Sequence, residues 1–148
     1  MDKHHLLLIV HLLSATIWVG GHLVLMCGFL PKALKEKNFD YIGNFEKTYE
    51  PIGMPALLLL GIMMAYDYDA TFTKWFSFSS AIERVVSTKL ILLLTTVCFA
   101  ISAQTRVLPK LRKGKIEKLP EMAVHIIGVT CIGITMVILG SFVRYGGF

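Results

Sequence analysis

Charged residues are scarce in this chain of 148 residues. Asp, Glu, Lys and Arg make up 17% of it, whereas 55% of the residues are hydrophobic, and the mean hydropathy is +0.64. Soluble globular domains carry about 25% charged residues, so the composition excludes an ordinary soluble domain. The sequence predicts an integral membrane protein.

Cysteine is also scarce, and the three cysteines lie in or beside apolar runs. They form no CxxC pair, and their positions do not suggest structural disulfides. The sequence shows no nucleophile and base constellation, no phosphate-binding glycine loop and no paired membrane carboxylates. These absences disfavour hydrolysis and phosphoryl transfer.

Long apolar runs are what the chain has in abundance. About 20 apolar residues span the roughly 30 Å hydrocarbon core of a bilayer. We predict an all-α bundle of four transmembrane helices in a single domain, residues 1–148, with helices at about 6–30, 49–66, 86–107 and 122–143. Pro51 and Pro55 suit the first turns of the second helix or a kink in it. No internal repeat is evident.

Basic residues are distributed unevenly among the loops. The loops after the first and third runs carry ten Lys and Arg, and the opposite side carries four. The positive-inside rule therefore predicts an inner (cytoplasmic) membrane protein with both termini on the non-cytoplasmic side. This topology explains the net charge of +5, so the predicted partner is membrane lipid and not nucleic acid. A homodimer that buries the glycine-rich helix faces stays open.

Three histidines lie inside the apolar runs. His11 and His22 share one helix face, because eleven steps of about 100° return to within roughly 20°, and they lie about 16 Å apart along the axis. His22 and His125 are predicted at similar depth on different helices, near the basic loops, with His11 in the other half. Ionisable groups in hydrocarbon mark functional paths, and histidine is the commonest metal ligand.

We therefore predict that His22 and His125 hold the iron of one haem b as axial ligands. His11 is expected to hold a second haem, with Lys89, the terminal pair His4 and His5, or an open position as its counterpart. The haem propionates would pair with arginines, for which the candidates are Arg84, Arg106 and Arg144. The expected function is electron transfer or a small-molecule redox reaction, so the chain is a candidate membrane oxidoreductase.

Two alternatives remain open at this point. Soft sulfur ligands together with imidazole select Cu(I), and the chain offers Met26, Cys27, Met54, Met122 and Cys131 beside His22 and His125. Copper transport or copper handling is therefore the second hypothesis. The third is a structural subunit whose histidines only form hydrogen bonds between helices.

Two segments resemble known families. The segment HLLSATIWVGG (residues 11–21) resembles the first helix of the copper-resistance D (CopD) family. The segment STKLILLL (residues 87–94) resembles that family and the HemJ-type protoporphyrinogen oxidases, in which a lysine opens the corresponding helix. The specific matches are His11, Trp18, Gly20 and Lys89.

The two resemblances imply different functions. The HemJ-like resemblance implies a haem-associated membrane fold in which His11 and Lys89 are important to activity. The CopD-like resemblance implies copper uptake or an uncharacterised membrane role. Residues 104–121 lack the Arg and Asn-Glu-x-Pro signature of HemJ-type proteins, so the likeness does not extend to protoporphyrinogen oxidation itself.

Overall fold

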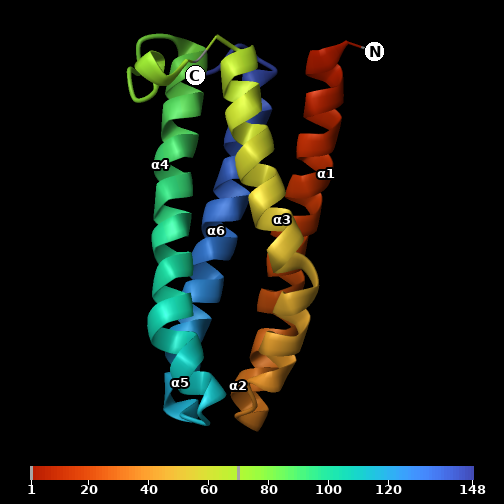
Figure 1. The fold of residues 1–148 in the computed structure, drawn as a ribbon, viewed down its shortest axis with the longest axis vertical. Helices are drawn as coiled ribbons and strands as arrows, with labels where there is room; N and C mark the ends of the chain where they lie inside the picture. The colour runs from red at the N-terminus through yellow and green to blue at the C-terminus, as the bar shows by residue number, and fades with distance from the viewer. Residues whose placement is uncertain (1, 70) are drawn as a thin grey trace.

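The structure is a computed structural model that describes residues 2–69 and 71–148 (Figure 1). Within these residues there is no strand, and four helical stretches are long and apolar enough to cross a membrane: Lys3–Glu36, Asp40–Asp67, Ala81–Arg112 and Ile116–Val143. Many of their large apolar side chains are exposed on the outside of the bundle, as a lipid-facing surface requires. The predicted all-α four-helix membrane bundle is confirmed.

The first and third stretches are built alike. Each consists of a 22-residue α-helix, a five-residue π-helical segment and a short α-helix. The first comprises α1 (Lys3–Val24), Leu25–Phe29 and α2 (Leu30–Glu36), and the third comprises α4 (Ala81–Ser102), Ala103–Val107 and α5 (Leu108–Arg112).

A proline follows each π-helical segment. Proline has no amide hydrogen to donate to the helix ladder. The residue before Pro31, Leu30, donates to the carbonyl of Leu25, five positions back, and Leu108 before Pro109 donates to Ala103 in the same way. This wider hydrogen-bond pattern is that of a π-helix, and the chain continues helically through the proline in both places.

The second crossing, α3 (Asp40–Asp67), begins nine residues before the predicted start at residue 49. Pro51 and Pro55 lie inside it and not in its first turns. The prediction of this boundary is wrong because residues 40–48 are mixed in charge and show little apolar character. Packing overrides that pattern, since Ile42 is fully buried against the neighbouring helices. The fourth crossing, α6 (Leu119–Val143), begins close to its predicted start.

The helices form two related hairpins, because α1 packs along α3 and α4 packs along α6. Lys3 corresponds to Ala81, Leu25 to Ala103 and Leu30 to Leu108, an offset of 78 residues each time (81−3, 103−25, 108−30). The two hairpins therefore share an order of segments although no internal repeat is evident in the sequence. The longest run of identical residues at this offset is Leu-Pro-Lys, at 30–32 and 108–110, which is too short to reveal the repeat in the sequence.

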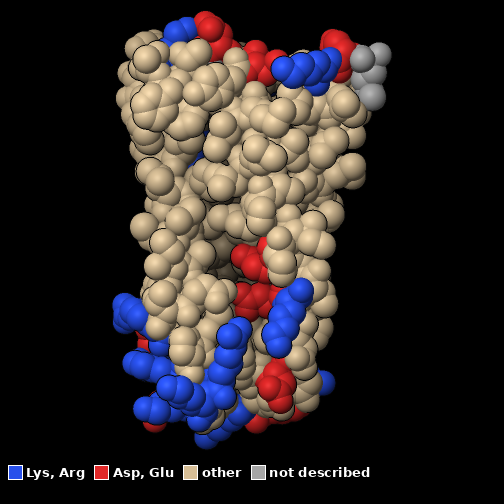
Figure 2. Space-filling view, in the orientation of Figure 1, with Lys and Arg blue, Asp and Glu red and all other residues tan. Residues whose placement is uncertain are grey.

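Both chain ends lie at one end of the bundle, and α2 and α5 lie at the other (Figure 1). Lysine and arginine side chains gather at the end that carries α2 and α5 (Figure 2). We call this end the basic end, and the half of the bundle nearer the chain ends the terminal half. The side of the membrane that the basic end faces stays a prediction.

The apolar core is concentrated toward the basic end. A smaller cluster at mid-height joins Trp18, Val19, Tyr49 and Val129. In the terminal half, the buried apolar residues among those described are Leu7, Ala65 and Val85, which belong to neither cluster. The terminal half thus buries fewer apolar residues than the basic half, whose cluster comprises Leu25, Leu30, Ala33, Ile42, Ala103, Val107, Leu108, Leu111, Leu119, Met122, Ala123 and Ile126.

Candidate functional site

His22 lies on the buried face of α1 and is 7% exposed. Its ring Nδ1 lies 3.1 Å from the carbonyl oxygen of Trp18, four residues earlier, and 3.3 Å from the hydroxyl of Tyr49 on α3. The carbonyl can only accept, so Nδ1 carries the hydrogen and Nε2 keeps its lone pair. This is the orientation that metal-ligating histidines commonly adopt.

His125 on α6 has a similar geometry. Its Nδ1 lies 2.8 Å from the carbonyl oxygen of Glu121, again four residues earlier, and its Nε2 lies 3.0 Å from the hydroxyl of Ser102. His22 and His125 line the same cavity of about 40 Å³. The structure therefore brings these two histidines to one depth on two helices, as their positions in the sequence predict. We call this space the inner cavity.

A porphyrin does not fit between His22 and His125 in this packing. A cavity of about 40 Å³ has room for about one water molecule, whose share of liquid volume is roughly 30 Å³. Pockets for small organic ligands measure about 300–1,000 Å³. The side chains of Phe99 and Thr96 and the helix at Val129 line the space that a macrocycle would need. The paired haem ligation predicted for these residues would require the helices to separate.

His11 differs from the other two membrane histidines. Its Nδ1 is buried and has no hydrogen-bond partner among the described residues, whereas His22 and His125 both direct Nδ1 to the carbonyl four residues earlier. Its ring faces Gly61 of α3, where an added Cβ would lie 3.7 Å from Cε1 of His11. A buried polar atom without a partner is costly, so this ring is suited to an added ligand.

Lys89 on α4 lies in the terminal half, as His11 does. It occupies the position of the second hairpin that corresponds to His11 in the first, since 89−11 equals the repeat offset of 78. Its Nζ lies 3.4 Å from the position that a Cβ on Gly140 would take, and it is close enough to His11 for an electrostatic interaction. Within the described chain it has no carboxylate partner.

The other candidate ligands of His11 lie elsewhere. The His4 ring forms a hydrogen bond with Asp67 at the end of α3 and a contact of 3.3 Å with the hydroxyl of Tyr68. This pairing ties the start of α1 to the end of α3. His5 is exposed. Neither side chain shows a contact with His11 in the part of the chain that the structure describes.

The three arginines predicted to hold propionates lie at the ends of the crossings. Arg84, five residues before Lys89 on α4, donates from Nε to the carbonyl of Phe148 at 2.5 Å. Arg106 lies in the basic half, and its Nη2 is 3.2 Å from a carboxylate oxygen of Glu121. Arg144 is exposed at the end of α6. Of the three, Arg84 is the nearest in sequence to Lys89, and their role toward a propionate stays a prediction.

The sulfur ligands predicted for copper come together in part, because two methionines share the inner cavity with His22 and His125 while the cysteines do not. Cys27, Cys98 and Cys131 are all free and exposed, whereas Met54 and Met122 do line the inner cavity. Among residues 2–69 and 71–148, no group of three or more His, Cys, Asp or Glu side chains is arranged to hold a metal ion.

Two carboxylates inside the bundle are missed by the sequence analysis. Glu46 and Glu50 lie one turn apart on α3, and both line the inner cavity. Glu50 accepts a hydrogen bond of 3.1 Å from Nε1 of Trp18. The prediction that the chain has no paired membrane carboxylates is therefore wrong, and it follows from the wrong start of α3. The four-residue spacing of Glu46 and Glu50, in register with Ile42, is the signal that could have revealed them.

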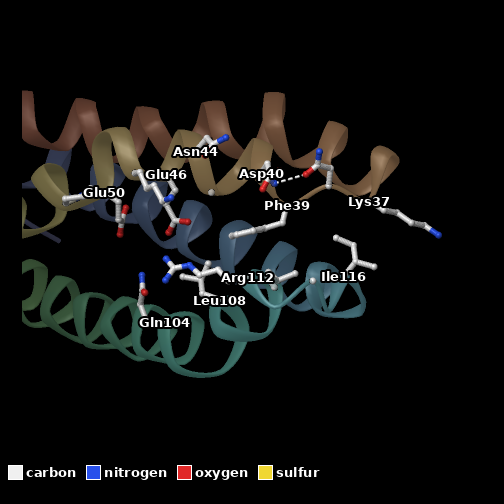
Figure 3. A pocket seen from close by; sticks show the side chains of 16 residues that line it. Lys37, Phe39, Asp40, Asn44, Glu46, Glu50, Gln104, Leu108, Arg112 and Ile116 are labelled. Carbon is white, nitrogen blue, oxygen red and sulfur yellow. Dashed lines mark hydrogen bonds between the residues drawn. The ribbon is translucent and has the colours of Figure 1, made fainter.

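A larger cavity leads from the basic end toward these carboxylates. Its volume is about 700 Å³, and it is lined by polar residues that include Asp40, Glu46, Glu50, Gln104 and Arg112. Arg112 and Gln104 reach toward the two glutamates from the opposite wall (Figure 3). On the outer surface, acidic side chains lie in and below a hollow among uncharged residues (Figure 2). We call the larger cavity the vestibule.

No family model, curated protein or solved structure matches this chain.

Proposed function

We propose that this chain is a membrane protein that binds haem b through His11 and acts in electron transfer or a small-molecule redox reaction. The observation that carries the proposal is the buried Nδ1 of His11, which has no hydrogen-bond partner within the described chain. Iron–imidazole coordination would satisfy this ring, and the likeness of His11 and Lys89 to the matching residues of HemJ-type proteins agrees with it.

The surroundings of His11 supply a cation that an anionic cofactor would use. The terminal half contains few buried apolar residues, and Gly61 and Gly140 present no side chain where they face His11 and Lys89. The Lys89 ammonium, which lacks a carboxylate partner in the described residues, would pair with a propionate through a charge-assisted hydrogen bond.

The roles of the protein and the cofactor are then distinct. A haem supplies an iron that changes its oxidation state, and the surrounding protein tunes the potential through ligand identity and burial. His11 would hold the iron, Lys89 would hold a propionate, and the outer apolar residues of α1 and α4 would keep water away.

The test is a cofactor assay on the full chain. The protein is expressed with excess haem precursor and purified in mild detergent, and its absorption spectrum and haem content per chain are measured. We expect a Soret band in the wild type and in His5→Ala, the matched control on the same helix. We expect loss of haem in His11→Ala and weaker haem retention in Lys89→Met. Haem retained by His11→Ala would contradict the proposal.

The same assay separates the alternatives. Equal haem loss in His22→Ala and His125→Ala, with His11→Ala unaffected, would favour the paired site predicted from sequence. Copper bound at one or more ions per chain to a colourless protein would favour copper handling. Absence of both, with all three His→Ala variants folded, would favour a structural subunit.

A further inference from the structure

The vestibule and the inner cavity share part of their lining. Glu46, Glu50 and Gln104 line both of them. The vestibule lies at the basic end, and the inner cavity reaches His22 and His125. Polar side chains therefore connect the aqueous basic end with two imidazoles deep in the bundle.

The two carboxylates are not held by ion pairs. Among the described residues, neither Glu46 nor Glu50 has a basic nitrogen within 4.0 Å of its oxygens. Arg112 faces Glu46 across the vestibule (Figure 3) and interacts with it only over a longer distance. Glu50 accepts the hydrogen bond from Trp18. Unpaired carboxylates in the interior of a membrane bundle are expensive, and chains of Glu and His inside such bundles carry protons.

From this arrangement we infer that Glu46, Glu50 and the imidazoles of His22 and His125 form a proton path that opens to water at the basic end. A proton from water in the vestibule binds a carboxylate oxygen of Glu46 and passes to Glu50. It then moves through water to an imidazole Nε2, which becomes an imidazolium as the carboxylate returns to its charged form. This inference does not depend on haem binding at His11.

The path has a defined inner end. The inner cavity has room for about one water molecule, which suffices to relay a proton. Val19 and Val129 are buried beside it, and the Thr130 hydroxyl lies 3.4 Å from the carbonyl of His22. This packing separates the inner cavity from the terminal half.

The charged and titratable groups that face the path come from α1, α3, α5, α6 and the C-cap of α2. Those of the vestibule are Lys37, Asp40, Glu46, Lys47, Glu50 and Arg112, and those of the inner cavity are His22 and His125, with Tyr49 in contact with His22.

The test uses infrared spectroscopy of the full chain in lipid bilayers, without added haem. A protonated carboxyl group gives a carbonyl band that shifts when the sample is moved from H₂O to D₂O. We expect such a band in the wild type over a range of pH in which exposed carboxylates are ionised. It should be lost in Glu50→Gln or Glu46→Gln and retained in Glu117→Gln, the exposed matched control. If Glu50→Gln fails to fold, Glu50→Asp takes its place as the second variant. It keeps a carboxyl group at this position and should retain the carbonyl band.

A second measurement tests the direction of access. Gln104→Cys is introduced into a chain whose native cysteines are replaced by serine, and it is then modified with a bulky maleimide. Because positioned proton carriers contribute factors of about 100 or more to the transfers in which they take part, blocking the path should slow the D₂O shift by at least about tenfold. The same modification at Ser79→Cys, at the opposite end, should leave the rate unchanged. A band unaffected by both glutamate variants, or an exchange rate unaffected by the block at residue 104, would overturn the inference.

Discussion

Gly20 and Gly21 are neighbours on α1 whose surroundings differ sharply. A Cβ added to Gly21 would lie 2.6 Å from Cδ2 of Tyr49, closer than side chains tolerate, whereas a Cβ added to Gly20 would meet nothing within 4 Å. Gly21→Ala and Gly20→Ala therefore add the same methyl group at adjacent positions, one into a ring and one into open space.

The two variants should change the free energy of unfolding in opposite directions. Replacing glycine by alanine inside a helix gains roughly 0.5–1 kcal/mol, and this gain applies in full to Gly20→Ala. Overpacking a filled site costs about 1–3 kcal/mol. Gly21→Ala should therefore lower the free energy of unfolding by about 1–2 kcal/mol, which places the two variants about 2 kcal/mol apart.

The ring displaced by Gly21→Ala also has a polar role. The Tyr49 hydroxyl lies 3.3 Å from Nδ1 of His22, and the ring packs edge-on against that imidazole at 5.4 Å between centroids. Moving the ring would disturb both contacts. We therefore expect Gly21→Ala to change the environment of His22 as well as the stability, whereas Gly20→Ala should leave His22 as it is.

The assay is reversible unfolding of the full chain in mixed micelles, as the fraction of denaturing detergent is raised and helicity is followed by circular dichroism. Labelled histidine resonances report on His22 in the same samples. Equal stability of the two variants would refute the close packing of α1 on α3 at Tyr49. So would a Gly20→Ala variant less stable than Gly21→Ala.

Three further predictions concern packing, charge and orientation. Gly53→Ala brings a Cβ within 3.1 Å of Cβ of Trp18 and should lower the unfolding free energy in micelles by about 1 kcal/mol; an unchanged value would contradict the contact. Glu121→Gln removes ion pairs of a half-buried carboxylate with two basic side chains and should cost less than about 1 kcal/mol if solvent still screens them, so a larger loss in the same assay would show that they are not screened. In intact cells, a membrane-impermeant maleimide should label Ser79→Cys, and it should label Gly114→Cys only after lysis; the reverse pattern would invert the predicted topology.

The sequence predicts the crossings well where apolar residues run without interruption. It fails at the start of α3, because Glu46, Lys47 and Glu50 give that segment the composition of a loop. Those residues lie in the helix because their polar side chains face the vestibule and the inner cavity, while the buried Ile42 and Tyr49 anchor the same turns. Local composition does not contain that information.

The candidate site is predictable in part. The helical rise brings His22 and His125 to a common depth, and the structure places them at one cavity. The sequence does not give the width of that cavity, because the packing of Phe99 and Thr96 sets it. The relation between His11 and Lys89 is also hidden, because it depends on a structural repeat whose two copies share few identical residues.

The pairing of His11 with Lys89 shows what is gained when both hairpins belong to one polypeptide. Two identical hairpins associating around a twofold axis would place the same residue at both equivalent positions. Two imidazoles or two ammonium groups would then face each other, and any substitution would change both at once. A covalently joined tandem is free of that constraint, so each hairpin can vary alone and the molecule can carry unlike chemistry at the two corresponding positions.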